Sequence, residues 1–389
     1  MSKLEELIQQ HCPDGVEYKK LEDCCQIWDS KRKPITKGSR VAGEYPYYGA
    51  NGIQDYVADY IFDGKYVLVG EDGSVITPNG TPVVNWAEGK IWVNNHAHII
   101  SEKEGTLLRY LFHYLQTVNI TPLIHGNIPK LTGGDFRALD IPVPPLPVQE
   151  EIVRILDNFA ELQAELQAEL QKRLQQYNYY RDKLLSFNEL NRGGQSVSVE
   201  WKKLGEIGKV CMCKRILKEQ TSSTGDIPFF KIGTFGGSAD AYISRELFDE
   251  YVKKYSYPKK GDILISAAGT IGRTVVFDGS PSYFQDSNIV WLKHDESVVL
   301  NSYLRYIYSL NPWAVSTGGT IARLYNDNIL NAVIPVPPLA EQQRIVDILD
   351  RFDKLTTDIT AGLPAEIEAR RKQYEYYRDQ LLTFKQKAS

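Results

Sequence analysis

The chain has 389 residues, of which 42% are hydrophobic and 24% charged, and its formal net charge is −4. This length allows two or three domains with hydrophobic cores. No stretch approaches the ~20 apolar residues of a transmembrane helix, and the acidic total charge counts mildly against nucleic-acid binding, which uses lysine and arginine to contact phosphates.

The first residues and the cysteines predict a reduced, cytoplasmic protein. The N-terminal stretch MSKLEELIQQH contains acids and no apolar core region, so it does not resemble a signal peptide. The five cysteines form no CxxC pair, which argues against a disulfide framework or a zinc site. Cys24-Cys25 and Cys211-Met-Cys213 fall in strand-like segments, where we expect the thiols to pack in the core.

Four segments follow one another along the chain. Residues 1–146 and 191–339 contain short β-branched and aromatic runs separated by glycine and proline, which is typical of mixed, β-rich domains. Residues 147–190 and 340–389 are charged and leucine-rich, which is typical of helices. Gly193-Gly194 marks a linker. The expected fold class is therefore α+β.

The second half of the chain repeats the first. Three motifs recur in the same order: IPVPPL at residues 141–146 and 334–339, IVRILDNF and IVDILDRF at 152–159 and 345–352, and YYRDKLLSF and YYRDQLLTF at 179–187 and 376–384. The duplication predicts two similar modules with a pseudo-two-fold internal repeat. The globular segments have diverged more than the helical ones, so we expect a shared task for the helices and two different tasks for the globular domains.

The helical segments predict a spacer. Pro-Pro in each IPVPPL forms a stiff, extended lead-in, because proline fixes φ and disfavours helix in the residue before it. The first helix carries AELQ three times over residues 160–171, and each repeat adds ~6 Å at ~1.5 Å per residue. The second helix is predicted to break at Gly362-Leu-Pro364.

We expect two long antiparallel helices that join the globular domains. An ordinary amphipathic helix pair would explain the leucine stripe but not the four-residue repetition. The residues expected in the spacer or at a subunit interface are Leu162, Leu166, Leu170, Leu174, Tyr177, Tyr180, Ile345, Leu349, Phe352, Tyr374 and Tyr377.

With these motifs in order, the whole chain resembles the specificity (S) subunits of type I restriction–modification enzymes. The resemblance rests on the duplication, the IPVPPL lead-ins, the YYRDKLLSF and YYRDQLLTF ends, and GLPAEIEARRKQYEYYRDQLL. The AELQ triplet resembles the four-residue spacer repeat of the type IC branch. The resemblance implies two target recognition domains, at residues 1–146 and 191–339, and conserved helical spacers at 147–190 and 340–389.

The resemblance also implies the function. Each globular domain would read one half of a split, asymmetric target in double-stranded DNA, and the helices would set the unread gap. Two modification (M) subunits, which use S-adenosylmethionine to methylate adenine, would dock on the helices, and restriction (R) subunits would join them. ATP and Mg²⁺ are expected on those partners. No cofactor, metal, membrane or catalytic residue is expected in this chain.

The residues agree with a non-catalytic subunit. There is no NPPY or NPPF motif of adenine methyltransferases, since Asn311-Pro312-Trp313 lacks the second proline, and no GxxxxGK[ST] loop. His96 and His98 are the best metal candidates, because alternation would place both on one strand face. No cysteine or acid completes a ligand set near them in the sequence, so no metal site is predicted.

Three pairs of matched segments provide the candidate DNA contacts. YVLVGEDGSV matches DILISAAGTI, which places Gly73 and Gly269 in corresponding loops, with Arg273 following in the second copy. GNIPKL matches GTIARL and provides Lys130 and Arg323. WVNNHAHII matches FQDSNIVWL and provides amides and a histidine: Asn95, His96, Gln285 and Asn288. Glycine allows close approach to phosphate, arginine can pair with guanine, and amides with adenine.

Two basic loops and one aromatic loop add further candidates. They contain Lys31, Arg32, Lys214, Arg215, Tyr48 and Asn51. Solvated charge would equally explain the basic loops, and core packing would equally explain Tyr48. Two other functions compete with DNA recognition, namely a protein–protein scaffold and a stand-alone DNA-modifying enzyme. A scaffold leaves the basic loops unexplained, and an enzyme would need the missing motifs.

Overall fold

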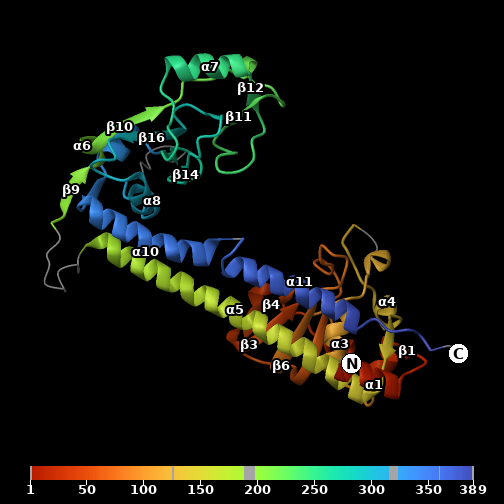
Figure 1. The fold of residues 1–389 in the computed structure, drawn as a ribbon. Coiled ribbons are helices and arrows are strands. Elements are labelled where there is room, and N and C mark those ends of the chain that lie inside the picture. The colour runs from red at the N-terminus through yellow and green to blue at the C-terminus, as the bar shows by residue number, and fades with distance from the viewer. Residues whose placement is uncertain (1, 125–126, 188–197, 315–322, 359, 388–389) are drawn as a thin grey trace. The chain divides into compact units, whose positions relative to one another are not determined.

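The computed structural model describes residues 2–124, 127–187, 198–314, 323–358 and 360–387, and the Gly193-Gly194 linker lies outside these ranges. The chain forms two compact units (Figure 1). Unit 1 comprises Met1–Ala168 with Glu366–Ser389, and unit 2 comprises Glu169–Ala365. Each unit therefore combines one globular segment with parts of both helical segments.

Unit 1 has a six-stranded sheet in the order β2-β7-β5-β6-β3-β4 and a two-stranded sheet of β1 and β8. Only β3 and β6 pair in parallel in these sheets. The strands are β1 (Glu17–Lys20), β2 (Gln26–Ile27), β3 (Ala42–Gly49), β4 (Gly52–Val57), β5 (Phe62–Gly70), β6 (Val84–Val93), β7 (Ala97–Ser101) and β8 (Asp140–Val143). The helices are α1 (Lys3–His11), α2 (Leu21–Cys24), α3 (Leu108–Leu115) and α4 (Gly133–Arg137), with the 3₁₀ turns η1 (Asp29–Lys31), η2 (Lys37–Ser39) and η3 (Thr121–Leu123).

Unit 2 has sheets in the orders β10-β16-β13-β14, β12-β11-β15 and β17-β9. Its strands are β9 (Glu200–Lys203), β10 (Gly208–Met212), β11 (Ile227–Phe230), β12 (Tyr242–Ile243), β13 (Ile263–Ser266), β14 (Thr274–Val276), β15 (Tyr283–Phe284), β16 (Ile289–His294) and β17 (Val333–Val336). Its helices are α6 (Leu204–Ile207), α7 (Arg245–Lys254), α8 (Asn301–Ser309), α9 (Asn326–Leu330) and α10 (Leu339–Thr357), with the 3₁₀ turn η5 (Lys218–Gln220). The mixed α and β content agrees with the expected fold class.

The internal repeat extends to strand register. Leu68 of β5 pairs with Ile99 of β7, and the matched residues Leu264 of β13 and Trp291 of β16 pair in the same way. Continuous apolar runs in β5 and β13 are buried, as expected of core strands. Positions in the two units can therefore be compared residue by residue.

One prediction about the cysteines was wrong. Cys24 lies in the single-turn helix α2, not in a strand, and its thiol donates to the Lys20 carbonyl. All five cysteines are buried and free. Burial raises the pKa of Cys24 to about 11 and that of Cys25 to about 12, so both remain neutral thiols at pH 7.

Helix α5 (Leu146–Ser186) packs antiparallel to a different helix in each unit (Figure 1). In unit 1, Phe159 lies 5.6 Å from Tyr377 of α11 (Leu363–Leu381), measured between ring centroids. In unit 2, Tyr180 lies 5.8 Å from Phe352 of α10. Helix α10 ends at Thr357 and α11 begins six residues later, which confirms the predicted break.

The expected interface residues differ in exposure. Ile345 and Leu349 are buried in the core of unit 2, where no partner could reach them. Leu162, Tyr180 and Tyr377 are exposed, whereas the remaining expected residues are partly buried. A helix that packs against one neighbour leaves part of its apolar stripe uncovered. Among the described residues, no helix is long and apolar enough to cross a membrane.

A buried glutamine fixes each Pro-Pro lead-in to its globular domain. Gln342 accepts from the Leu300 amide at 2.9 Å and donates to the Val298 and Pro337 carbonyls at 3.0 and 2.8 Å. Gln149 makes the same three bonds in unit 1, to Leu107, Gly105 and Pro144. The sequence analysis did not single out these residues, although both follow IPVPPL at the same distance.

We expect Gln342→Leu to lower the free energy of unfolding by about 3 kcal/mol, because three backbone groups lose their partner and each buried unsatisfied group costs ~1–3 kcal/mol. Denaturant unfolding of the full chain measures this. Gln343→Leu is the matched control, since the Gln343 side chain is exposed and donates to Asp347 on the same helix. Equal losses in the two variants would contradict the role of Gln342.

A buried histidine connects α3, α5 and α11 in unit 1. His113 Nε2 lies 2.7 Å from Asp157 Oδ1, and Nδ1 lies 3.3 Å from the Tyr374 hydroxyl. Burial lowers the pKa of His113, and the neighbouring Asp157 only partly offsets this. Arg109 and Arg378 also face the ring and disfavour its protonation. The pKa of Asp157 is raised by burial but lowered more by its hydrogen bonds, so Asp157 remains ionised.

We expect this histidine to make unit 1 less stable in weak acid. Because the pKa of His113 is lower in the folded state, the unfolded chain binds more protons once the pH falls below about 6.5, and stability then decreases. His113→Gln should weaken this dependence between pH 8 and pH 5, as measured by thermal unfolding. His11→Gln, at the exposed end of α1, should leave it unchanged. An unaltered pH profile in His113→Gln would refute the assignment.

Candidate nucleic-acid interface

The three predicted segment pairs converge in each unit. In unit 1 the Glu71 amide donates to the His96 carbonyl at 2.9 Å, and the Leu131 amide donates to the Glu71 carbonyl at 2.8 Å. In unit 2 the matched bonds run from Ala267 to Asn288 and from Leu324 to Ala267, at 2.7 and 2.9 Å. The same backbone frame therefore presents three loops in both units. Gly319, in the GTIARL loop, lies outside the described residues.

A groove of about 540 Å³ lies over these loops in unit 1. Four candidate residues line it, namely Asn51, Gly73, His96 and Lys130. Its other lining residues include Gln54, Asp72 and Ile128. The exposed Ile128 side chain precedes Lys130 by two residues, so an apolar and a cationic group stand together at this surface.

The charges around the unit 1 groove are paired. Lys130 Nζ lies 3.3 Å from Glu71 Oε1, and the imidazole Nδ1 of His96 contacts the Asp72 carboxylate. Because Asp72 accepts a hydrogen bond from Nδ1–H, the His96 Nε2 atom, which contacts no other polar group in the described part of the chain, is available for a ligand. A histidine held in this way can accept from an exocyclic amino group of a base, or donate to a guanine when protonated.

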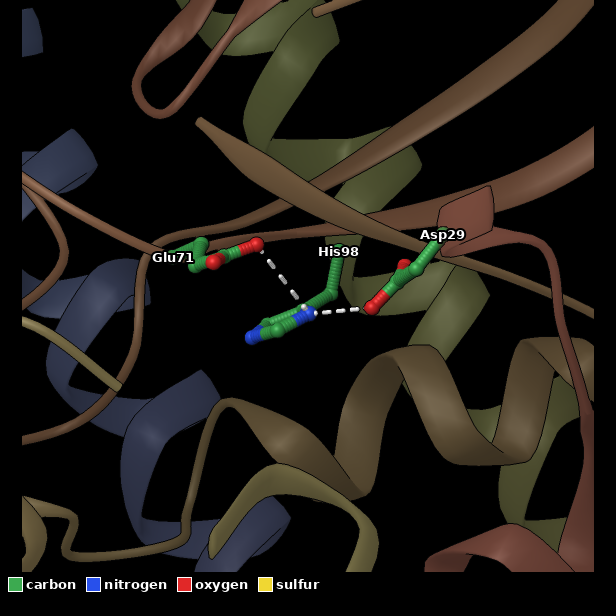
Figure 2. Close-up of side chains that lie close together, drawn as sticks. All are labelled: Asp29, Glu71 and His98. Atoms are coloured by element: carbon green, nitrogen blue, oxygen red, sulfur yellow. Dashed lines mark hydrogen bonds and ion pairs between the residues drawn. The ribbon is translucent and has the colours of Figure 1, made fainter. Parts of the chain in front are cut away.

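Behind the groove lies a buried ion cluster of Asp29, Arg32, Glu71 and His98. Figure 2 shows His98 between the two carboxylates, with Nδ1 2.6 Å from Asp29 Oδ2 and 3.6 Å from Glu71 Oε2. His98 Nε2 lies 3.0 Å from the Leu131 carbonyl. Both ring nitrogens of His98 therefore lie beside oxygen atoms, which fixes the orientation of the imidazole.

Asp29, Glu71 and His98 offer ligand atoms within 4.8 Å of one another, the spacing of a metal site. However, Arg32 Nη1 lies 2.6 Å from Glu71 Oε2 and its Nη2 lies 3.6 Å from Asp29 Oδ2. Burial raises the pKa of Asp29, but hydrogen bonds from His98 and Ile99 lower it more, so the carboxylate remains charged. The Arg32 guanidinium thus already balances the negative carboxylate charge that would otherwise attract a metal ion. We therefore assign the cluster as an internal ion network.

The cluster corrects the expectation that no acid completes a set near these histidines. Asp29 and Asp72 contact His98 and His96, respectively, but come from other segments of the chain. The histidines also differ in environment, because His98 is buried in β7 whereas His96 is exposed in the preceding turn. The acids that contact the two histidines could therefore not be found by looking only at residues close to them in the sequence.

Unit 2 has a groove of about 410 Å³ over its matched loops. Arg215, Gln285 and Asn288 line it, together with Lys218 and Lys231. Arg215 Nε lies 2.9 Å from Asp286 Oδ2. Two of these cations, Lys218 and Lys231, were not among the candidate residues, although Lys218 belongs to the same basic loop as Arg215.

Arg323 holds the turn beside this groove. Its Nη2 atom donates to the Ser287 carbonyl at 3.2 Å, the Ser287 hydroxyl at 3.3 Å and Asn288 Oδ1 at 3.3 Å. Ser287 has a φ of 51°, a conformation that non-glycine residues adopt rarely and that often marks a functional site. Within the described ranges, no carboxylate pairs with Arg323.

The remaining candidates occupy varied positions. Asn95, Arg273 and Lys31 are exposed, with the Lys31 ammonium 4.4 Å from the Trp28 ring centroid, and Lys214 Nζ lies 5.3 Å from the Tyr255 ring centroid. Gly73 and Gly269 have φ values of 80° and 66°, so both loops require the left-handed conformation that glycine tolerates.

Two candidates, Arg32 and Tyr48, are turned inward and are corrected here, and a third, Gln285, is partly engaged by the backbone. Arg32 is only 12% exposed at its side chain because both carboxylates of the ion cluster hold it. Tyr48 is 8% exposed because it packs in the core of the six-stranded sheet. Gln285 reaches its groove but uses Oε1 to accept from the Ile232 amide at 2.9 Å, which leaves its amide nitrogen for a ligand.

Comparison with known proteins finds relatives that are all specificity subunits or domains of type I restriction–modification systems. The family described as "Type I restriction modification DNA specificity domain" matches residues 13–176 and 197–369. A putative type I restriction enzyme specificity subunit of Haemophilus influenzae is 54% identical over 95% of this chain and 96% of its own length. The EcoR124I/EcoR124II specificity subunit of Escherichia coli is 37% identical over 72% of this chain and 71% of its own length.

Two solved structures share the fold. The S subunit of a type I restriction–modification system from M. genitalium superposes with a TM-score of 0.53 at 16% identity, covering 94% of this chain and 95% of that one. A chain from a study of complex assembly and conformational transition in the type I R-M system gives 0.56 at 18% identity, covering 95% and 98%. At these identities the likeness concerns the fold alone.

Proposed function

Because the chain belongs to the family of type I restriction modification DNA specificity domains, and is a non-catalytic subunit that recognises DNA, we propose that its two grooves each read one half of a split, asymmetric target. The observation that carries this proposal is the repeated backbone frame with different side chains. Lys130, His96 and Asn51 stand at the unit 1 groove, whereas Arg323, Asn288 and Arg215 stand at or beside the unit 2 groove. Two backbone frames of the same geometry that carry different hydrogen-bond donors and acceptors would select different bases in the two half-sites.

Two modification subunits would dock on the repeated helix ends. Tyr179 and Tyr180 on α5, and Tyr376 and Tyr377 on α11, form two matched pairs of exposed tyrosines. Exposed aromatic pairs at repeated positions suit two copies of one partner, since tyrosine contributes strongly to protein interfaces. Of these four tyrosines, the expected interface set contained Tyr180 and Tyr377, and Tyr179 and Tyr376 extend it.

The partners would provide the chemistry. S-adenosylmethionine would bind the modification subunits, and ATP and Mg²⁺ would bind the restriction subunits, in the cytoplasm where their DNA target lies. The groups at the grooves of this chain are amides, hydroxyls and paired charges, which suit hydrogen bonding to DNA. The AELQ repeats of α5 would set the gap between the two half-sites.

The test is to co-express the chain with its modification subunit and map methylated adenines in the host genome. The expected result is one split, asymmetric motif with adenine modified in both halves. A complex that assembles and methylates no split motif would contradict the proposal and would favour the scaffold hypothesis.

A further inference from the structure

Glu71 distinguishes the DNA-binding frame of unit 1 from that of unit 2. The matched residue in unit 2 is Ala267, which makes the same two backbone hydrogen bonds and has no polar side chain. Two further members of the ion cluster have no counterpart there, whereas Arg32 corresponds to Arg215, which pairs with Asp286 instead. Asp29 and His98 correspond to Met212 and Val290, which face one another in the β10–β16 pair. The Glu71 carboxylate is thus an addition to a frame that forms without it.

The Glu71 carboxylate is held firmly from behind the groove. Its Oε2 atom lies 2.6 Å from Arg32 Nη1, and the Arg32 guanidinium in turn donates to the Asp29 and Ala97 carbonyls at 2.9 and 2.7 Å. The Glu71 side chain is only 13% exposed. A carboxylate oxygen paired with a guanidinium that is itself held by two backbone carbonyls has little freedom to turn.

The other Glu71 oxygen faces the groove and holds Lys130. Oε1 lies 3.3 Å from Lys130 Nζ, and the Lys130 side chain remains 46% exposed at the groove wall. An ammonium on a four-carbon stem is otherwise a mobile point charge that can contact any nearby phosphate. Pairing with a fixed carboxylate keeps it near one point of the groove and lowers its net attraction for phosphates.

Unit 2 achieves the same fixation in a different way. Arg323, at the position of Lys130, is held by Ser287 and Asn288 through its Nη2 atom and has no carboxylate partner among the residues described in this unit. Arginine needs no added acid for a defined orientation, whereas lysine does. The lysine in unit 1 and its added glutamate therefore make one functional pair.

We propose that Glu71 is a positioning residue that sets the base preference of the unit 1 half-site, by holding the Lys130 ammonium against a base edge rich in acceptors, such as guanine O6 and N7. This inference rests on the proposed reading of a split DNA target. Glu71 itself need not touch DNA, because it acts through Lys130. When the carboxylate is lost, Lys130 should move to phosphates, and discrimination at one base position should fall.

The experiment uses the complex with the modification subunit and maps methylated motifs for Glu71→Gln. We expect methylation of sites carrying another base at one position of one half-site to rise about tenfold, with the other half-site and the gap unchanged. Lys130→Met should relax the same position. The double variant Glu71→Gln/Lys130→Met should match Lys130→Met alone, because Glu71 has nothing left to hold.

Two further variants separate positioning from folding. Glu88→Gln removes a carboxylate that pairs with Lys65 on the exposed surface of the same unit, and it should change nothing. Glu71→Asp retains the charge but shortens the side chain, so it should shift the base preference even if Glu71→Gln fails to fold.

An unchanged motif in Glu71→Gln and Glu71→Asp, alongside an altered one in Lys130→Met, would overturn this inference and leave the proposed function intact. Equal weakening of both half-sites, with a lower unfolding midpoint, would show a structural role and would also overturn it. Absence of any split motif in the wild-type complex would instead overturn the proposed function.

Discussion

Replacing Arg323 by methionine is expected to reduce methylation of the split target about 100-fold in the assembled complex. One bidentate contact to a base is worth ~1–3 kcal/mol, and Arg323 also holds the Ser287 turn, whose φ of 51° is otherwise unfavourable. The variant should therefore lose a DNA contact and the shape of the loop that carries Asn288. Initial methylation rates on a synthetic duplex measure the effect.

The matched control is Arg245→Met, which removes an exposed arginine from α7 in the same unit, away from the groove. Arg323→Lys retains the positive charge but removes the planar guanidinium, so it shows which of the two properties recognition requires. Two results together would show that Arg323 only neutralises a phosphate. Arg323→Lys would restore activity, and the salt dependence of DNA binding by Arg323→Met would be lower by about one phosphate contact. Activity of Arg323→Met within twofold of wild type would refute any role in recognition.

Much of this interface followed from local motifs. Lys130 and Arg323 belong to the matched motifs GNIPKL and GTIARL, and the leucine after each of them makes the same backbone bond in its unit. The break between α10 and α11 likewise followed from the local motif Gly362-Leu-Pro364. Features encoded by neighbouring residues were therefore predictable from one sequence.

The errors share a different cause. Arg32 looked like a DNA contact because it lies in a basic loop, but Asp29 and Glu71 turn it inward, and Glu71 is 39 residues away. Tyr48 belongs to a glycine-flanked motif that predicted a loop, and yet it lies in strand β3 and packs in the core. Burial and ion pairing between distant segments depend on tertiary packing, which a local pattern does not encode.

The two units show how one frame can acquire two preferences. Strand register and the backbone bonds of Glu71 and Ala267 are the same, so the fold does not decide which base is read. The groove residues differ, and residues behind the groove differ as well, from charged in unit 1 to apolar in unit 2. Specificity can therefore change by substitutions that leave every strand in place.

Deleting one AELQ repeat is expected to move methylation to a target with a shorter gap and to abolish it on the original one. Removing residues 164–167 shortens α5 by ~6 Å, and one base pair of duplex rises ~3.4 Å, so the gap should shrink by about one or two base pairs. Neither groove contains a residue of α5, so both half-sites should be unchanged. Genome-wide mapping of methylated adenine measures both quantities at once.

The helices can accommodate this deletion. Phe159 and Tyr180 anchor α5 to α11 and α10 on either side of the repeats. The chain that packs against α5 is not one continuous helix, because α10 ends at Thr357 and α11 begins at Leu363, so shortening α5 does not require a shortened continuous partner helix. Leu166→Ala is the control, since it alters the same repeat without shortening it and should retain the original gap. A changed half-site with an unchanged gap would contradict the view that α5 is the spacer, because the repeats would then act on base reading.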